Sequence, residues 1–290
     1  MQAVDSVRSR DRTGQVIAER YRIDGQIARG GQGVIYRATD LKDNDQVAIK
    51  ILSESFAEAP EWRERMFREA QAMTILQGTN AVRVFDQQWS EDGLLCLIME
   101  LLVGSDFEDY LRNIEARGHK LTIPQLATIM DPVAQTLEVA HNAGILHRDL
   151  KPGNIFVLND GSVRLLDFGF AKFMRMRAMT QVGFVAGSPS YIAPEAWKGD
   201  PSLLDHRIDV YGLAAVIFRA LSGKPPFLAG ELLELLKLAT TGKRPSLHAL
   251  RPDLPKEVDE WVEQALAIEP SDRFLRVRGM WMALRQLGWK

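Results

Sequence analysis

A predicted β-hairpin over residues 154–167 constrains the fold of this chain more than any other stretch. Two short apolar runs flank the sequence Asn-Asp-Gly-Ser, which is typical of a tight turn between antiparallel strands. With Asp160 and Gly161 as a two-residue loop, Asn154 pairs with Asp167 at the open end of the hairpin. Cross-strand neighbours lie about 5 Å apart, so an amide oxygen and a carboxylate would lie side by side.

These two oxygen ligands would suit a hard cation such as Mg²⁺, which takes few protein ligands and fills its shell with water and phosphate oxygens. The alternative is that Asn154 and Asp167 only cap the ends of the two strands. The hairpin by itself does not decide between a metal site and strand caps, so the rest of the chain has to.

A cluster of polar residues precedes the hairpin, in the sequence ILHRDLKPGNIFVL. So many polar groups between two apolar segments indicate chemistry as well as structure. An aspartate next to a substrate hydroxyl can orient it and accept its proton, and a lysine two residues later can neutralise a transferred phosphoryl group. The cluster consists of His147, Arg148, Asp149, Lys151 and Asn154.

A lysine lies within an otherwise apolar predicted strand, QVAIKIL, over residues 46–52. Strand alternation places Ala48 and Lys50 on one face and the valine and isoleucines on the other. Burying an unpaired ammonium is costly, and a lone lysine usually extends its charged end to the surface. Glu69 interrupts the inward apolar stripe of a predicted helix over 59–77, which would match a buried Lys50–Glu69 ion pair.

A glycine cluster, QIARGGQGVIYRA, lies between two strand-like segments at residues 26–38. Glycine lets backbone amides approach phosphate oxygens because no Cβ atom is in the way. The cluster alone is a weak signal, since many glycine-rich hairpins look similar. No helix follows it, so it is not the fingerprint of a dinucleotide-binding site.

The composition limits the class of protein. The chain has 290 residues, 46% of them hydrophobic, which is enough for a large core and suggests two lobes. A net charge of −2 provides no basic field for nucleic acid or an anionic membrane. The only cysteine, Cys96, lies in an apolar run, so we expect a buried thiol and a reducing compartment.

Targeting signals are missing from the sequence. No apolar run reaches 18 residues, and the N-terminus lacks the core of a signal peptide, so we expect a soluble, cytoplasmic protein with no membrane segment in this chain. The start of the chain carries Arg8, Arg10 and Arg12 interspersed with acidic residues, which predicts a solvated tail.

The hydrophobic pattern divides the chain into a small β-rich part and a larger helical part. Strand-like segments fill the first hundred residues apart from the one helix, and the pattern beyond about residue 105 is mainly helical. The expected boundaries are a tail over 1–20, a smaller lobe over 21–102 and a larger lobe over 103–290. A cleft between two such lobes is a usual ligand site.

Eight motifs follow one another along the chain: ARGGQGVIY, VAIK, Glu69, HRDLKPGN, DFG, APE, DVYGLA and DRF. In their order and spacing the chain resembles the eukaryotic-like serine/threonine protein kinases, most closely the bacterial members. The resemblance implies an α+β, bilobal kinase fold with one regulatory helix in the smaller lobe and a single catalytic domain over 21–287. It also implies transfer of the γ-phosphate of ATP, with Mg²⁺, to protein serine and threonine hydroxyls, and autophosphorylation of the activation segment.

The resemblance implies a catalytic role for each matching position. Lys50 would hold the α- and β-phosphates and pair with Glu69. Asp149 would be the catalytic base, and Lys151 would contact the γ-phosphate. The implied Mg²⁺ ligands are Asn154 and Asp167.

The resemblance also implies a nucleotide site. Backbone groups of Glu100 and Leu102, just past Met99, would bind adenine, and Asp106 falls where the family often places a carboxylate on the ribose. The residues that would sandwich the base are Ile35, Ala48 and Phe156. The residues of the phosphate loop are Ile27, Ala28, Gly30, Gly31 and Gly33.

Other matching positions imply structural roles and the class of substrate. Glu195 should pair with Arg273, and Asp209 should brace the catalytic loop. The sequence DLKPGN favours serine/threonine over tyrosine specificity. The sequence GSPSYIAPE supports this, with Ser188 where the family usually has threonine.

The chain departs from the family pattern in the phosphate loop and on the helix after Asp209. Ala28 replaces the first glycine of the phosphate loop, for which we expect altered nucleotide affinity and no loss of activity. Gly212 and Ala214 replace the common serine and glycine on the helix after Asp209, and we expect a packing change with little bearing on chemistry.

The activation segment differs from that of many relatives. Arg148, next to the catalytic base, predicts a loop ordered by a phosphate–arginine pair. The position where many relatives carry the phosphorylated threonine is Phe184, and Thr180 is the only threonine in the segment. One hypothesis makes Thr180 the main autophosphorylation site. The alternative is a loop held by apolar contacts of Phe184 and Val185 that needs no phosphate.

Two rival functions remain on the sequence alone. A pseudokinase, which binds nucleotide or acts as a scaffold, usually lacks one of the lysine, aspartate and asparagine residues that are all present here. A small-molecule kinase would lack APE and GSPSY. The expected partners are protein substrates and, by resemblance, a second copy bound through the smaller lobe. An amphipathic segment over 230–245 is a candidate docking surface if its leucines are exposed.

Overall fold

The structure, a computed structural model, describes residues 11–30, 33–53, 73–168 and 189–287. The chain forms two compact units. The smaller unit comprises residues up to 70 together with 83–102, and the larger unit comprises 71–82 and everything from 103 onward. The predicted α+β fold is confirmed, with a β-sheet in the smaller unit and a mainly helical larger unit. The helix predicted over 59–77 lies mostly outside the described residues.

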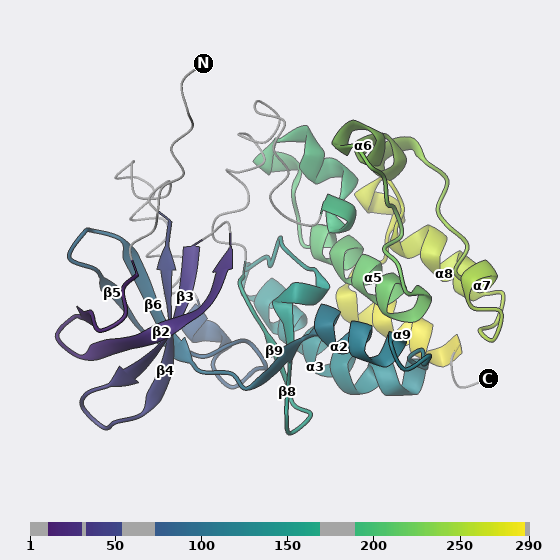
Figure 1. Cartoon of the computed structure of the whole chain (residues 1–290). Helices are drawn as coiled ribbons and strands as arrows, with labels where there is room; N and C mark the ends of the chain where they lie inside the picture. The colour runs from purple at the N-terminus through teal and green to yellow at the C-terminus, as the bar shows by residue number, and fades with distance from the viewer. Residues whose placement is uncertain (1–10, 31–32, 54–72, 169–188, 288–290) are drawn as a thin grey trace, which may run out of the picture. The chain divides into compact units, whose positions relative to one another are not determined.

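The smaller unit is built on one antiparallel sheet with the strand order β1-β2-β3-β4-β6-β5 (Figure 1). Its strands are β1 (Val16–Ile17), β2 (Tyr21–Gly30), β3 (Gly33–Asp40), β4 (Gln46–Leu52), β5 (Val84–Trp89) and β6 (Leu95–Glu100). Val47, Ile49 and Ile51 belong to a buried core together with Cys96, as strand alternation predicts. Burial raises the pKa of the Cys96 thiol to about 11, so this cysteine is a structural group.

The described part of the N-terminal segment packs on the smaller unit. Arg12 forms an ion pair with Asp92, and its side chain is only 14% exposed. Ile17, in β1, is 1% exposed and joins the sheet core. The prediction of a solvated tail is therefore wrong for this part of the chain, because the ion pair of Arg12 and the buried side chain of Ile17 attach it to the sheet. Arg8 and Arg10 lie outside the described residues.

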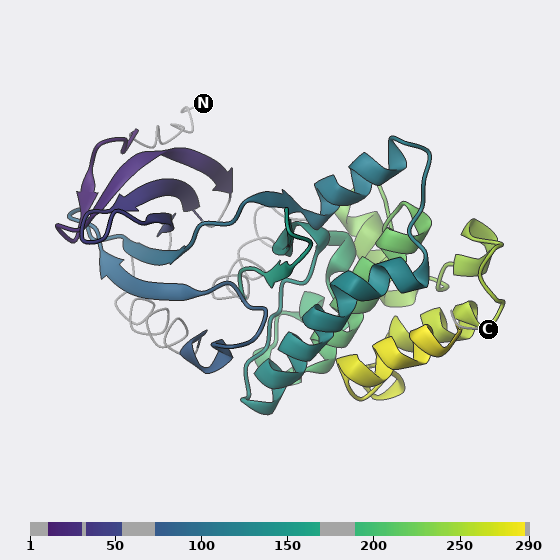
Figure 2. The ribbon, with the colours of Figure 1, turned by 90° about the horizontal axis from the view of Figure 1, so that it is seen from below.

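The larger unit consists mainly of helices packed around one central helix (Figure 1). Its helices are α2 (Phe107–Glu115), α3 (Ile123–Asn142), α5 (Arg207–Ser222), α6 (Leu232–Thr241), α7 (Leu247–Leu250), α8 (Val258–Ala265) and α9 (Val277–Leu287). Every residue of α5 from 208 to 221 is buried, which makes it the central helix. Helices α3 and α9 run side by side (Figure 2), where Trp281 donates to a carboxylate oxygen of Asp131 at 2.6 Å.

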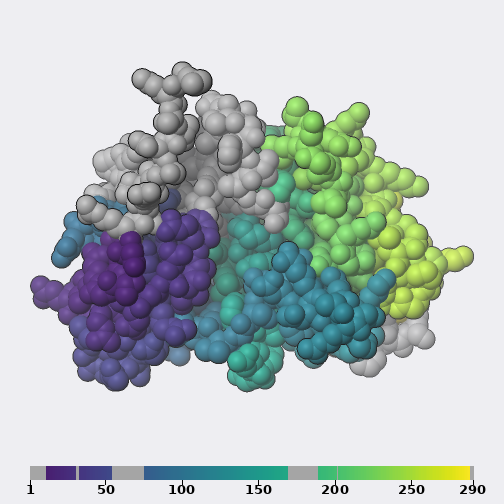
Figure 3. Space-filling model, viewed as in Figure 1, coloured from purple at the N-terminus to yellow at the C-terminus, as the bar shows by residue number. Residues whose placement is uncertain are grey.

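Helix α6 lies at the surface of the larger unit (Figure 3). It is shorter than the amphipathic segment predicted over 230–245. Leu235 and Ala239 are buried against Phe227, whereas Leu233 is 75% exposed. The predicted amphipathic character is therefore present.

A three-stranded sheet in the larger unit contains β7 (Gly104–Asp106), β8 (Ile155–Leu158) and β9 (Val163–Leu165), in that order. The observed β8–β9 pairs are Ile155–Leu165, Phe156–Arg164 and Val157–Val163. This register differs by one residue from the predicted one. The loop contains three residues and ends at Gly161, whose φ of +83° is the left-handed conformation of a three-residue hairpin loop. The predicted Asn154–Asp167 pair is therefore wrong, because Asn154 bonds to the backbone of Leu166.

Candidate active site

Asp209, in the first turn of α5, anchors the loop that carries the polar cluster. Its carboxylate is 1% exposed and accepts hydrogen bonds from the backbone amides of His147 and Arg148, both at 2.8 Å. Burial alone would raise the pKa of Asp209, but hydrogen bonds from His141 and the His147 amide hold it below its ordinary value. The carboxylate therefore stays ionised and fixes the loop, as the sequence predicts.

His147 links this loop to the segment that follows the hairpin. Its Nδ1 accepts from the backbone amide of Asp149 at 3.2 Å, which assigns the ring proton to Nε2. Nε2 then donates to the carbonyl oxygen of Leu166 at 2.8 Å. The imidazole is fully buried and lies 4.8 Å from the Phe168 ring. Burial lowers the pKa of His147, so the ring is neutral and connects Asp149 to Leu166 without adding a charge.

Arg148 has a left-handed backbone conformation, with φ at +62°. Such a conformation in a non-glycine residue costs on the order of 1–3 kcal/mol and persists only where neighbouring contacts enforce it. Here Asp209 bonds the amides of both Arg148 and His147. In the described part of the chain, the buried Nε atom of Arg148 has no hydrogen-bond partner.

Asp149 is held by two polar side chains from the same loop. The Nζ of Lys151 donates to Oδ2 of Asp149 at 3.0 Å. The amide nitrogen of Asn154 donates to the same oxygen at 3.1 Å and to the Asp149 carbonyl at 2.7 Å. The carboxylate, only 3% exposed, lies between a cation and an amide. This arrangement can orient a hydroxyl group and accept its proton.

A backbone hydrogen bond joins Asn154 to the residue before Asp167. The Asn154 carbonyl accepts from the amide of Leu166, the residue before Asp167, at 2.8 Å. Because the Asn154 Nδ2 donates to Asp149, its Oδ1 lies on the other branch of the amide. An amide oxygen and a carboxylate are the ligands Mg²⁺ prefers, so the donor set fits this ion. No group of three or more His, Cys, Asp or Glu side chains that could hold a metal occurs among the described residues.

Asp106 and Phe156, both predicted to contact the nucleotide, lie directly opposite each other across β7 and β8. Asp106 also has a structural role, because its Oδ1 accepts from the Asp109 amide at 3.0 Å and caps the N-terminus of α2. The side chain of Phe156 is half-buried. The structure thus gives Asp106 a capping function that the sequence analysis missed, although an aspartate just before a helix is a typical signal for one.

The smaller unit brings four predicted nucleotide residues together on one face of its sheet. Lys50 pairs with Ile35 on β3, and Ala48 pairs with Met99 on β6. Cross-strand partners share a face, so all four lie opposite the buried core. Lys50 is only 6% exposed. Its predicted partner, Glu69, lies outside the described residues.

The end of β6 carries the two residues predicted to bind adenine through their backbone. The amide of Glu100 donates to the Arg83 carbonyl at 3.0 Å, and its side chain accepts from the Arg83 amide at 2.8 Å. Leu102 follows the strand and is half-buried. This stretch is therefore held to the chain just before β5.

The described residues of the predicted phosphate loop lie at the end of β2 and the start of β3. Ile27 lies at a bulge, and Ala28 pairs with Ile35. Gly33 has a φ of +146°, and a Cβ atom there would lie 2.1 Å from the Ile51 carbonyl oxygen. Glycine is therefore required where β3 approaches β4. Gly30 pairs with Gly33 and has open space around it, and Gly31 lies outside the described residues.

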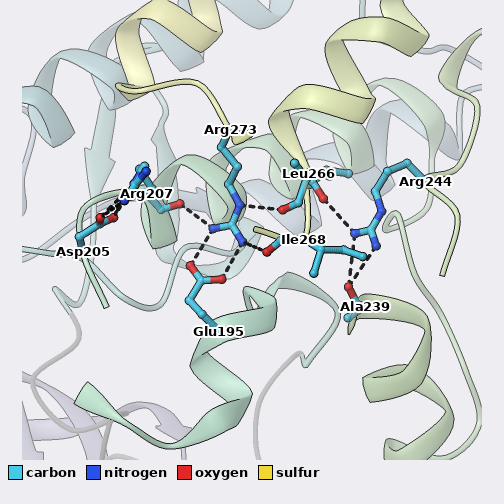
Figure 4. Close-up of polar contacts among 9 residues, drawn as sticks. Glu195, Asp205, Arg207, Ala239, Arg244, Leu266, Ile268 and Arg273 are labelled. Atoms are coloured by element: carbon cyan, nitrogen blue, oxygen red, sulfur yellow. Dashed lines mark hydrogen bonds and ion pairs between the residues drawn. The ribbon is translucent and has the colours of Figure 1, made fainter. Parts of the chain in front are cut away.

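The predicted ion pair between Glu195 and Arg273 is present and buried (Figure 4). Two guanidinium nitrogens of Arg273 donate to the carboxylate at 2.6 and 2.7 Å. The same guanidinium donates to the carbonyls of Ala267, Ile268 and Arg207 at 2.8, 2.9 and 3.1 Å. The pair thus joins distant segments of the larger unit.

Two structural side chains were not found from the sequence. His141 donates from Nε2 to Asp209 at 2.8 Å, and its position at the end of a helix six residues before His147 was the only signal. Arg244 is buried and donates to the carbonyls of Ala239 and Leu266, at the ends of α6 and α8 (Figure 4). An arginine directly after Lys243 and before Pro245 gives no sequence signal for this role.

Several predictions about regulation and location reach beyond the described residues. The candidate phosphorylation site Thr180, the substrate-platform residue Ser188, and Phe184 and Val185 of the alternative hypothesis all lie outside them. Within the described residues, no helix is both long and apolar enough to cross a membrane.

Comparison with known proteins gives consistent results. Residues 21–279 match the family described as protein kinase domain. The chain is 35% identical over 254 residues to serine/threonine-protein kinase PknH of Mycobacterium tuberculosis, covering 88% of this chain and 40% of PknH. It is 35% identical over 268 residues to PknA of the same species, covering 91% of this chain and 60% of PknA. It therefore spans less than two thirds of either relative.

Solved structures agree with these sequence matches. The crystal structure of the M. tuberculosis PknI kinase domain superimposes with a TM-score of 0.75 at 28% identity. The match covers 95% of this chain and 98% of that domain.

Proposed function

This chain belongs to the protein kinase family, and we propose that it is a bacterial serine/threonine protein kinase of the eukaryotic-like type. It uses ATP and Mg²⁺ to phosphorylate serine and threonine hydroxyls of proteins, including its own activation segment. The observation that carries the proposal is the environment of Asp149, a buried carboxylate bonded by Lys151 at 3.0 Å and Asn154 at 3.1 Å. The backbone amides before it are fixed by Asp209.

In the proposed reaction, Asp149 orients the substrate hydroxyl and accepts its proton as the oxygen attacks the γ-phosphorus. The bond from phosphorus to the β-phosphate oxygen breaks, the bond to the substrate oxygen forms, and ADP leaves. Lys151 neutralises the charge of the phosphoryl group in transfer. When bound, Mg²⁺ would neutralise phosphate oxygens, and Asn154 and Asp167 are the residues that would hold it.

ATP would contact the residues whose positions match the nucleotide-binding motifs of the family. Lys50 would contact the α- and β-phosphates and pair with Glu69. Its burial in a sheet face shared with Ile35, Ala48 and Met99 supports this role. The other residues proposed to contact ATP are Ile27, Ala28, Gly30, Gly31, Gly33, Glu100, Leu102, Asp106 and Phe156.

Regulation would act through Arg148. Its buried Nε atom has no hydrogen-bond partner in the described residues, which supports a role in binding a phosphate on the activation segment, with Thr180 as the acceptor. We further propose that the protein acts in the cytoplasm on protein substrates, binds neither nucleic acid nor membrane through this chain, and pairs with a second copy through the smaller unit.

A pseudokinase is the less favoured function. Loss of one of four residues usually marks such a protein, and all four are present: Lys50, Asp149, Asn154 and Asp167. Nucleotide binding alone does not separate the two functions, because a pseudokinase can also bind ATP. Phosphoryl transfer does.

The test is transfer of labelled phosphate from ATP with Mg²⁺ to the protein itself and to a generic basic protein substrate. Asp149→Asn removes the proposed proton acceptor and should lower transfer about 100-fold or more. The matched control is Asp160→Asn, because Asp160 is exposed in the hairpin loop, where its carboxylate accepts a hydrogen bond from the Ser162 amide. That variant should transfer phosphate like the wild type.

Two outcomes would contradict the proposal. Equal transfer by wild type and Asp149→Asn would remove Asp149 from the reaction. No transfer by the wild type, after addition of both acceptors, would favour a nucleotide-binding protein with another task.

A further inference from the structure

The side chain of Arg219, near the end of α5, binds both ends of helix α2. Its guanidinium donates to Oε1 of Glu108 at 2.8 Å and to the two carboxylate oxygens of Glu115 at 2.5 and 3.2 Å. Glu108 lies in the first turn of α2, and Glu115 is its last residue. The two glutamates are about two helical turns apart and so lie on the same face. One cation thus holds α2 at two points.

The cation in this Glu108–Arg219–Glu115 cluster is largely shielded from water. The side chain of Arg219 is 6% exposed, whereas those of Glu108 and Glu115 are 25% and 32% exposed. Without the guanidinium, two like charges would share a partly buried place and repel each other. Arg112 lies 3.6 Å from Glu108 but is 67% exposed, so water screens this second contact. A neutral side chain at position 219 would therefore release both ends of α2.

The start of α2 determines where the carboxylate of Asp106 lies. Asp106 is the N-cap of α2, and its Oδ1 accepts from the Asp109 amide at 3.0 Å. The backbone of Asp106 is held separately, because it pairs with Phe156 on β8. A shift of α2 would move the Asp109 amide against this fixed backbone and so turn or release the Asp106 side chain. The position of α2 therefore controls the carboxylate that is proposed to contact the ribose.

We propose that Arg219 is a positioning residue for nucleotide binding. By holding α2 through Glu108 and Glu115, it keeps the Asp106 carboxylate in the direction that binds the ribose hydroxyls. This inference rests on the proposed kinase function, in which Asp106 contacts the ribose of ATP. It gives a role in nucleotide discrimination to an ion cluster that lies outside the eight motifs of the sequence.

The test measures dissociation constants of ADP and 2′,3′-dideoxy-ADP for the whole chain, by titration calorimetry with Mg²⁺. Neither nucleotide can donate a γ-phosphate, and the second lacks both ribose hydroxyls, so the ratio of the two constants reports the ribose contact. A hydrogen bond to a charged acceptor changes affinity by roughly 10-fold or more, so we expect the wild type to prefer ADP by about that factor. Asp106→Ser removes the carboxylate but keeps a capping oxygen, and should lower the preference to about 2-fold or less.

Two arginine variants separate positioning from general damage to the fold. Arg219→Met keeps an unbranched side chain and removes the charge, and it should lower the preference for ADP to about 3-fold or less. The matched control is Arg244→Met, because Arg244 is a buried arginine of the same unit that donates to carbonyl oxygens at the ends of α6 and α8. That variant should lose stability as well and keep the wild-type preference.

Glu115→Gln tests the same contact from the far end of α2. Glu115 lies about 13 Å along the helix from Asp106, so its effect on ribose binding has to pass through the helix. We expect the preference for ADP to fall by about 2-fold or more, and the double variant with Arg219→Met to be no worse than Arg219→Met alone. Because Glu115 is partly exposed, this variant decides the matter even where Arg219→Met fails to fold.

Three results would overturn the positioning role. They are a wild-type preference in Glu115→Gln and Arg219→Met, an equal loss of preference in Arg244→Met, and a wild type that binds both nucleotides equally well. The last would remove the ribose contact of Asp106 itself. A wild type that prefers ADP as expected but transfers no phosphate would count against the kinase function alone, because the binding ratio would still report the position of Asp106.

Discussion

Replacing Glu195 with alanine should be among the most destabilising single changes in the larger unit. Glu195 is 4% exposed and its partner, the side chain of Arg273, is fully buried. The substitution removes two charge-assisted hydrogen bonds, at 2.6 and 2.7 Å, each worth roughly 1.5–3 kcal/mol. It also leaves the guanidinium buried with only carbonyl oxygens as acceptors. We therefore expect the free energy of unfolding to fall by about 3–5 kcal/mol.

A matched control comes from an exposed ion pair in the same unit. Arg112 and Asp109, on α2, lie 3.2 Å apart, with 67% and 58% of their side chains exposed. Exposed pairs contribute little because water and salt screen them, so Arg112→Ala should lie within about 0.5 kcal/mol of wild type. Comparing the two variants separates the effect of burial from that of removing a charge.

The assay is urea unfolding followed by circular dichroism, with the dependence on urea compared between variants to confirm that the same surface unfolds. A loss of less than about 1 kcal/mol in Glu195→Ala would refute the reasoning. It would mean that water or a rearranged side chain compensates the Arg273 charge. Glu195→Gln, which keeps the shape and one acceptor oxygen, should give an intermediate loss.

Two further predictions concern a glycine and a histidine. Gly33→Ala should lower the free energy of unfolding by about 2 kcal/mol or more, because the new Cβ would lie 2.1 Å from the Ile51 carbonyl oxygen. Gly30→Ala, where the Cβ would meet open space, should lower it far less. Calorimetry of both variants checks this, and equal melting temperatures would contradict it. Burial lowers the pKa of His147 in the folded protein below its unfolded value of 6.5, so the unfolded chain binds more protons and stability should fall as the pH drops below about 6.5. Urea unfolding at several pH values should show this loss, and His147→Asn should reduce it; an unchanged pH dependence in that variant would assign the loss to other groups.

The strand carrying Lys50 shows which features can be predicted from sequence. Alternation alone put Val47, Ile49 and Ile51 on the core face and Ala48 with Lys50 on the other, as observed. Side-chain period in a strand is a direct consequence of backbone geometry. The motifs likewise identified the loop around Asp149, because residues that are close together in one segment remain close together in the folded chain.

Contacts that depend on a turn or on distant segments were harder to predict. The sequence Asn-Asp-Gly is compatible with hairpin loops of two or three residues. The prediction used a loop of two residues, whereas the structure has a loop of three, so the observed pairing is shifted by one residue and Asn154 does not pair with Asp167. The hydrogen bond from His141 to Asp209 joins residues 68 positions apart. No local sequence pattern around either residue indicates the other as its partner, so the pair is visible only in the folded structure.

Strand β1 extends the folded domain ahead of the residues that match the kinase family. The match begins at residue 21, but the segment before it exchanges backbone hydrogen bonds with Ile23, from Gly14 and to Gln15, both at 2.8 Å. A protein trimmed to the family boundary would lose an edge strand and expose the flank of β2. It would also have a gap in the sheet core where Ile17 had been. The family match marks what kinases have in common, and the packed sheet of this chain begins before that match.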